Sequence, residues 1–303
     1  MLLVKVLNPL QGVYQLDLEP GGFTNLVSVY LVDTGRGFIM FEGGPAVTSN
    51  EMLSATRSLR ANVTHVFLTH VHIDHYGGSG IIGLLNPGVE YYVHPRGSKA
   101  LRNPDIVWVP AREAMGWLGE LYGKPLEVSQ GSIRETRDGD VITIGDVTVE
   151  VVHTPGHASH HQSFIIKPHD LLVVGDAAGI YVKELDYVIP TTMEPLRLDM
   201  YIESIKKLIA RNPRYIAYTH HLIVPNATEL LSRHLRQVEV WRGAIEEAVR
   251  EGLSVDDAEK LLIERDDGLR GVYERLRSMR AHYHLFRMAI DGLYKYIKGG
   301  RTG

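Results

Sequence analysis

The sequence predicts an α/β fold in which stacked β-sheets lie between layers of helices. Short apolar runs rich in β-branched residues recur through the first two-thirds of the chain, and helical patterns follow only some of them. Because helices do not follow every strand, stacked sheets fit this pattern better than a strictly alternating parallel sheet. Near residue 225 the strand patterns stop, and only helical patterns continue to the end of the 303-residue chain.

The first elements are expected in the following order. The N-terminal run MLLVKVLNPL is a candidate first strand, and two β-rich runs at 27–32 and 37–41 are expected to form a hairpin. A helical pattern follows at 49–59, and a buried-strand pattern follows it at 65–68. Further strands are expected at 89–93, 141–144, 147–152, 163–166, 171–174 and 215–218, with a helix at 198–210.

Helices alone are expected after the last strand. Asn226 with Glu229, and Ser254 with Asp257, have the spacing of N-terminal capping pairs. The final helix has one apolar stripe and ends at a glycine pair; the stripe is Leu285, Met288, Ala289, Leu293 and Tyr296. We therefore divide the chain into an α/β domain at 1–225 and a helical C-terminal domain at 226–303.

Composition limits the kinds of site and partner that the chain can have. The chain contains no cysteine, which excludes thiolate metal ligands, whereas its 15 histidines make an imidazole-based metal site feasible. The formal net charge of −4 gives no general attraction to nucleic acid, and we expect none as a partner. No apolar run approaches the roughly 18 residues that span a bilayer, and Asn8-Pro9 interrupts the N-terminal run. We expect a cytoplasmic protein that is not bound to a membrane.

The run THVHIDHYGG at 69–78 is dense in residues that bind metals, and it directly follows a predicted buried strand. His70 and His72 are two residues apart, so their side chains point to the same side of an extended segment. Asp74 and His75 follow at a turn and can face a second point nearby. Loops at strand ends are favoured places for active sites in layered α/β folds. We interpret this run as a metal site rather than as a group of solvated loop histidines.

Three later strand ends supply more residues of the same kind. His157 follows a turn in the sequence TPGH, and Asp176 ends the apolar run LLVVGDAAG. His220 and His221 follow the predicted strand at 215–218. Four separate strand ends that each offer a histidine or an aspartate indicate one composite site.

The order of these motifs resembles the metallo-β-lactamase superfamily over about residues 10–225, and a later segment, IPTTMEPLRLD, resembles a stand-alone prokaryotic branch related to glyoxalase II. The resemblance implies a four-layer αββα sandwich with a two-metal centre at one edge of the sheets, here followed by an α-helical C-terminal appendage. It implies that the first metal is bound by His70, His72 and His157, that the second is bound by Asp74, His75 and His220, and that Asp176 bridges both. We choose His220 over His221 because it comes first after the strand, where the last ligand of the family lies.

This ligand set defines the expected chemistry. Imidazole and carboxylate ligands suit Zn²⁺, and also Fe or Mn. Two such ions would share a hydroxide with a pKa lowered to about 7, and Asp74 would orient it as a catalytic residue. We expect a hydrolase of ester, thioester, lactone or phosphodiester bonds in small-molecule substrates, with promiscuity among them because the pocket walls alone select.

Two other functions of this superfamily remain open. A persulfide dioxygenase would use a single iron, here bound by His70, His157 and Asp176. An RNA-processing nuclease would carry an RNA-binding arm or an inserted domain, but only residues 177–219 separate Asp176 from His220. A non-catalytic binding module would be favoured by missing ligands, and none is missing.

The C-terminal helices have two expected roles. They could cover the pocket, as in the thioester hydrolase glyoxalase II, or build a homodimer interface. Their last part contains a basic run that could attract an anionic substrate, although such a run is more often a solvated helix face. The run consists of Arg270, Arg275, Arg277, Arg280 and Arg287.

Five other side chains are candidates for supporting roles. Glu42 in FEGGP stands where the family usually has an aspartate, and it could orient a metal-bound histidine. Tyr181 and Tyr187 follow Asp176 on an expected active-site loop, where a phenol could donate to a substrate oxygen or simply pack in the core. Trp108 and Trp117 could form a hydrophobic lid or pack between helices.

Overall fold

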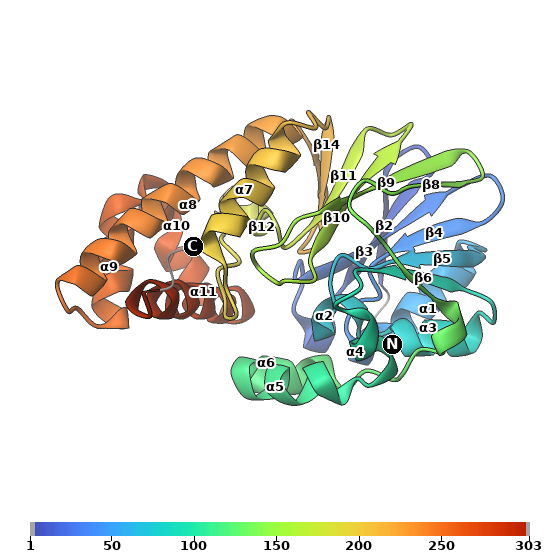
Figure 1. The fold of residues 1–303 in the computed structure, drawn as a ribbon, viewed down its shortest axis with the longest axis horizontal. Coiled ribbons are helices and arrows are strands. Elements are labelled where there is room, and N and C mark those ends of the chain that lie inside the picture. Colours follow the sequence, from blue (N-terminus) through green and yellow to red (C-terminus); the bar gives the residue numbers. More distant parts are fainter. Residues whose placement is uncertain (1–3, 301–303) are drawn as a thin grey trace.

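Two mixed β-sheets stack face to face at the centre of the protein in a computed structural model, which describes residues 4–300 (Figure 1). The first sheet has seven strands in chain order: β1 (Lys5–Leu10), β2 (Val13–Leu18), β3 (Val27–Asp33), β4 (Phe38–Phe41), β5 (Val63–Phe67), β6 (Glu90–Val93) and β7 (Ile133–Glu135). Strands β1 to β4 pair antiparallel, and β4 to β7 pair parallel.

The second sheet has the strand order β15-β14-β11-β10-β9-β8. Its strands are β8 (Val141–Ile144), β9 (Val147–His153), β10 (Gln162–Lys167), β11 (Leu171–Gly175), β14 (Tyr215–Tyr218) and β15 (Ile223–Pro225). Only β11 and β14 pair parallel, so both chain segments leave the sheet at the same edge. A separate hairpin of β12 (Ile180–Val182) and β13 (Tyr187–Ile189) follows β11.

Alternating side chains of both sheets fill the space between them. Phe41 and Phe67 of the first sheet meet Phe164 of the second, with ring centroids 5.6 and 5.3 Å from that of Phe164. The neighbours of these residues along the strands, such as Met40 and Val66, point to the opposite face and belong to a second buried cluster. This period of two is what a strand buried on both faces requires, and it gives each sheet an outer apolar face that helices must cover.

Helices cover both outer faces (Figure 1). The helices α1 (Ser49–Ser58) and α3 (Ser79–Leu85) lie on the first sheet, α7 (Leu198–Ile209) lies on the second, and α8 (Ala227–Arg250) packs against α7. The other helices are α2 (Ile73–Tyr76), α4 (Ser98–Arg102), α5 (Asp105–Met115), α6 (Trp117–Tyr122), α9 (Val255–Arg265), α10 (Asp267–Ser278) and α11 (Arg280–Lys298). The predicted αββα sandwich with a helical C-terminal region is confirmed.

The last strand ends at Pro225, and every later element within the described residues is a helix. These helices do not form a core of their own, because Trp241 of α8 and Leu285 of α11 belong to the same buried cluster as the outer faces of the sheets. The division into domains at 1–225 and 226–303 therefore stays a prediction. In residues 4–300, no helix is long and apolar enough to cross a membrane.

The two predicted capping pairs have different outcomes. Ser254 caps α9 as expected, because its hydroxyl accepts a hydrogen bond from the backbone N–H of Asp257. The prediction for Asn226 and Glu229 is wrong: Asn226 has φ 62° and makes no capping hydrogen bond. A capping side chain needs an extended backbone at its own residue, and the chain turns through the left-handed region here instead.

Asp266 fastens the C-terminal helices to the rest of the protein. Its Oδ1 caps α10 by accepting from the N–H of Leu269 at 3.0 Å. Its Oδ2 accepts from the Tyr187 hydroxyl of β13 at 2.8 Å and from Nε1 of Trp241 in α8 at 3.0 Å. One carboxylate thus joins two helices and a hairpin, and its loss leaves donors without an acceptor.

We expect Asp266→Ala to lower the free energy of unfolding by about 2–4 kcal/mol, because it removes a helix cap and orphans two side-chain donors. Asp267→Ala is the matched control, since the Asp267 side chain is 89% exposed and pairs with the neighbouring Arg270, and we expect it to cost less than about 1 kcal/mol. Urea unfolding followed by circular dichroism measures both. Equal costs for the two variants would contradict this role.

Candidate metal centre

The ends of four strands bring the predicted ligands together at one edge of the sandwich. The loop after β5 and the short helix α2 carry four of them, and the loops after β9, β11 and β14 carry one each. Six of the seven side chains are buried and His72 is half-buried. The set comprises His70, His72, Asp74, His75, His157, Asp176 and His220, and its atoms form overlapping groups in which all members lie within 4.8 Å of one another.

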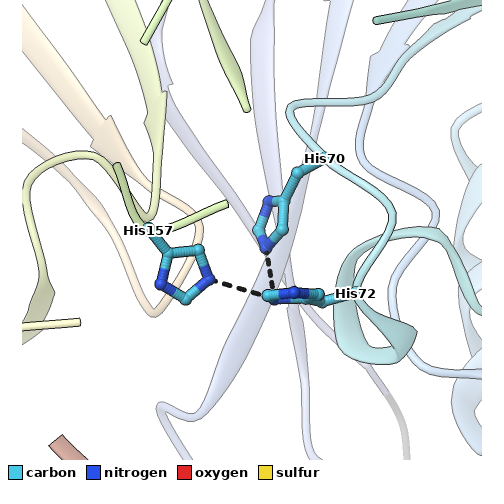
Figure 2. Close-up of side chains that lie close together, drawn as sticks. All are labelled: His70, His72 and His157. Carbon is cyan, nitrogen blue, oxygen red and sulfur yellow. Dashed lines mark hydrogen bonds between the residues drawn. The ribbon is translucent and has the colours of Figure 1, made fainter. Parts of the chain in front are cut away.

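Three histidine nitrogens form the first group (Figure 2). Nδ1 of His72 lies 3.0 Å from Nε2 of His70 and 3.0 Å from Nε2 of His157. The other ring nitrogen of His157, Nδ1, donates to the backbone carbonyl of Thr191 at 2.9 Å. That hydrogen bond fixes the tautomer, so the lone pair of His157 Nε2 points into the group.

Asp74, His75 and His220 form the second group. Nδ1 of His220 donates to the carbonyl of Leu26 at 2.7 Å, which leaves Nε2 free to face the site. Nε2 of His75 and Nε2 of His220 each lie 3.7 Å from Oδ2 of Asp74. Two imidazoles and a carboxylate therefore surround a second point.

Asp176 lies between the two groups. Its Oδ2 is 3.3 Å from Nε2 of His157 in the first group. Its Oδ1 is 3.4 Å from Nε2 of His75 and from Nε2 of His220 in the second. A single carboxylate with one oxygen directed to each group has the geometry of a bridging ligand.

The electrostatics of the cluster fit a bound cation. Burial and neighbouring imidazoles hold the pKa of His70 and of His72 well below the usual range, so both rings are neutral. Burial alone would lower the pKa of His75, but the carboxylates of Asp74, Asp176 and Glu42 raise it to about 10. The site thus favours positive charge at its second point.

Unpaired atoms point to the same conclusion. Nε2 of His75 and Oδ1 of Asp176 are buried and make no hydrogen bond, although they lie 3.4 Å from each other. Burying a polar atom without a partner is costly, and native proteins rarely tolerate it. A divalent cation would satisfy both atoms at once, so the residues present fit the metal that the sequence predicts.

Glu42 reaches the site in spite of its longer side chain. It lies at the end of β4 with φ 70°, and this left-handed backbone turns its side chain toward the loop after β5. Its Oε1 accepts from the Thr69 hydroxyl and lies 3.3 Å from Nδ1 of His75, while its Oε2 accepts from the Thr69 N–H at 3.2 Å. The expected supporting role is thus matched by contacts: Glu42 fixes the ring of His75.

Neighbouring histidines lie around the cluster in different ways. Nε2 of His161 accepts a hydrogen bond from the backbone N–H of Asp176 at 2.9 Å, so His161 positions the backbone of Asp176. Gly175 makes this approach feasible, because a Cβ there would lie 2.5 Å from Nε2 of His161. His221 does not join the grouped ligand atoms, and its backbone carbonyl accepts from Ser28 instead.

A buried network connects His157 to the C-terminal helices. The backbone carbonyl of Thr191 accepts a hydrogen bond from His157, and the Thr191 hydroxyl donates one to the backbone carbonyl of Asp176. The Tyr201 hydroxyl of α7 lies 3.0 Å from the Thr191 hydroxyl and donates to Nε2 of His234 in α8 at 2.9 Å. Burial lowers the pKa of His234 to about 4, so its neutral ring can accept this bond. The sequence offered no signal for this chain of contacts.

The supporting candidates outside the cluster have structural roles. The Tyr181 hydroxyl donates to Asp186 and the Tyr187 hydroxyl donates to Asp266, so both phenols pack and pair away from the ligands. Trp117 of α6 contacts the C-terminal helix, since the guanidinium of Arg280 lies 4.4 Å from its ring. Trp108 of α5 is buried in the large apolar cluster. The expectation that the tyrosines donate to substrate is not supported.

An αββα sandwich with a cluster of histidines and aspartates at its loop edge is the architecture of a class of metal-dependent hydrolases. The model of the metallo-beta-lactamase superfamily matches residues 23–220. This chain belongs to that superfamily, whose members are generally hydrolytic enzymes.

Similar proteins come from archaea, bacteria and fungi. A metallo-beta-lactamase fold-containing protein of Sulfurisphaera tokodaii is 29% identical over 76% of this chain and 85% of its own length. The solved structure of that protein aligns with this one with a TM-score of 0.66. The structure of a metallo-beta-lactamase family protein of Thermus thermophilus aligns with a TM-score of 0.67, at 19% sequence identity. That alignment covers 97% of this chain and 96% of the Thermus chain. An atrochrysone carboxyl ACP thioesterase of Aspergillus aculeatus is 24% identical over 69% of this chain, which spans only 57% of that protein.

We expect Thr191→Val to weaken divalent metal binding by about tenfold, because it removes the hydroxyl that supports Asp176 while it keeps the shape of the side chain. Thr192→Val is the matched control: Thr192 is equally buried, but its hydroxyl donates to Ala289 of α11 rather than toward the cluster. Competition with a chromophoric chelator measures the affinity. If the two variants bind metal equally well, the Thr191 hydroxyl does not support the site.

Proposed function

We propose that this protein is a two-metal hydrolase that cleaves small-molecule esters and thioesters, with zinc as its metal. His70, His72 and His157 would hold the first ion, and the second would be held by the group that contains His75 and His220. Asp176 would bridge the two. The observation that carries the proposal is the convergence of all seven side chains, with Nε2 of His75 and Oδ1 of Asp176 buried and without a hydrogen bond.

The same observation favours two ions over one iron. A persulfide dioxygenase would use His70, His157 and Asp176 only. The remaining ligands, Asp74, His75 and His220, would then surround a second buried point that holds no cation. That arrangement is costly, because buried polar atoms need partners and buried carboxylates need compensating charge.

Each residue would contribute in its own way. The bound ions would supply Lewis acidity, which polarises a substrate oxygen and makes water acidic enough to attack near pH 7. Oδ2 of Asp74 faces both imidazoles of the second group, and Asp74 would orient the attacking water and accept its proton as the catalytic residue. Glu42 and Thr191 would keep the imidazoles in their productive tautomers.

The type of bond is part of the proposal. The fungal relative named as an ACP thioesterase supports thioesters, and the same machinery would also act on esters, lactones or phosphodiesters. The pocket beside the cluster has neither lysine nor arginine among its described lining residues, which favours a small neutral substrate over RNA.

Metal content is the first test. Protein purified without chelators or immobilised metal is expected to contain two zinc ions per chain by elemental mass spectrometry. A chelator should abolish thioester hydrolysis, and added zinc should restore it. One iron per chain with little zinc, together with oxygen consumption in the presence of a persulfide, would sink the two-zinc hydrolase and favour the dioxygenase.

The last ligand has a test of its own. We expect His220→Gln to lose one of the two ions and to lower kcat by about 100-fold or more, because the second point then has a single imidazole. The adjacent His221→Gln is the control, and it should keep both ions and most of the activity. The opposite result would assign the ligand to His221.

A further inference from the structure

A narrow pocket leads to the metal cluster, and its walls are apolar. It has a volume of about 100 Å³, and one end is formed by five of the predicted ligands: His72, Asp74, His157, Asp176 and His220. Most of the other lining residues are aliphatic or methionine and come from α5, from the segment after β13, and from α11. The helices α5 and α11 are neighbours, with α11 above and to the left of α5 in the view of Figure 1. The C-terminal helix therefore builds part of the substrate site.

Three methionines from three separate segments form the apolar wall. Met115 ends α5, Met193 lies in the segment after β13, and Met288 lies in α11, and all three are half-buried. Methionine is unbranched and polarisable, so it adapts to apolar groups of different shape. Leu285 and Ile180 complete the wall with buried aliphatic surface.

The backbones that carry these methionines are fixed, so the wall is a formed site rather than a loose gap. Nε2 of His284 in α11 donates to the carbonyl of Met115 at 2.9 Å, which joins the end of α5 to α11. The Thr192 hydroxyl donates to the carbonyl of Ala289 at 2.8 Å, which joins the segment beside Met193 to the same helix. Gly292 lets the two approach, because a Cβ there would lie 2.3 Å from the carbonyl oxygen of Thr192.

The apolar part of the pocket offers no cation to pair with an anionic group. Among the described lining residues none is cationic, and the one charged residue outside the metal cluster is Glu194, which pairs with Lys295 at 3.4 Å. Arg287 of α11 is occupied elsewhere, since it pairs with Asp256 at 2.7 Å and with Glu259. None of the five arginines of the basic run is among the described lining residues, which agrees with the alternative of a solvated helix face.

We propose that the wall formed by Met115, Met193 and Met288 is an acyl-binding subsite that selects substrates with a short, linear, uncharged hydrocarbon acyl group. This inference rests on the proposed hydrolase function. The volume is about two-thirds of the ~150 Å³ cavity that accepts benzene, so a short acyl group fits. The carbonyl carbon lies at the metal end and the alkyl chain lies between α5 and α11.

The reaction is a simple hydrolysis. The oxygen of water bonds to the acyl carbonyl carbon, and the bond from that carbon to the thiol sulfur breaks. The sulfur leaves with the electron pair of that bond and takes up a proton that the water has released. The products are the free carboxylic acid and the thiol, and no oxidant or further reactant is needed.

The test is a series of thioesters of one uncharged thiol, N-acetylcysteamine, with acetyl, butanoyl, hexanoyl and succinyl groups and zinc-loaded protein. We expect kcat/KM to rise about fourfold for each methylene that the wall covers. Succinyl has the length of butanoyl but ends in a carboxylate, and it should react at least about 100-fold more slowly than butanoyl. Equal rates for these two, or no rise from acetyl to butanoyl, would overturn the subsite.

Met288→Lys is the matched variant. It should remove the dependence on chain length and raise the rate of the succinyl thioester relative to that of the butanoyl thioester. Met200→Lys is the control, because Met200 of α7 is 41% exposed and does not line the pocket, so its chain-length profile should match the wild type. An unchanged profile in Met288→Lys would also overturn the subsite.

Binding of inert ligands separates this inference from the hydrolase proposal. Linear amides from acetamide to hexanamide should bind the zinc-loaded wild type about fourfold more tightly for each methylene, with a negative heat-capacity change in calorimetry, and should lose this trend in Met288→Lys. If no thioester is hydrolysed but the amides show the trend, the hydrolase proposal fails and the subsite stands. If hydrolysis occurs and the amides show no trend, the subsite fails.

Discussion

The carboxylate of Asp176 is buried between two groups of histidines, and the surrounding structure is arranged to make that burial tolerable. Burial alone would raise its pKa, but His75, His220 and His157 hold the pKa well below its usual range, so the group is charged in a site almost closed to water. A buried charge is stable only when it is paired on every side. Asp176 faces imidazole nitrogens with both oxygens, and His161 holds its backbone from behind.

Imidazoles can serve such a carboxylate, or a cation beside it, only if each ring presents the correct nitrogen. The protein achieves this by giving the opposite nitrogen a fixed acceptor. His157 and His220 donate to the backbone carbonyls of Thr191 and Leu26, and His75 faces the carboxylate of Glu42. These acceptors come from segments far apart in the sequence, so the metal centre depends on the packing of the whole sandwich rather than on its loops alone.

The C-terminal helices support both the metal centre and the pocket wall. Helix α8 contributes His234 to the network that supports Thr191, and α11 contributes Met288 to the wall beside the same cluster. A single set of helices thus links the orientation of a ligand to the shape of the substrate site. The reactive end of the pocket is polar and the rest is apolar, which is the usual division between chemistry and selection in small-molecule sites.

The sequence by itself determined the layered fold and the residues of the candidate metal site. Strand period, strand-end position and the spacing in THVHIDH are local properties, so they can be read without coordinates, and the structure brings all seven residues together. The acceptors that orient the rings, the reach of Glu42 and the wall around Met288 could not be read in this way. Backbone carbonyls have no sequence signature, and an apolar residue on a helix looks the same whether it faces a core or a substrate. The tertiary arrangement of α5 and α11 alone decided that Met288 lines the pocket rather than a closed core.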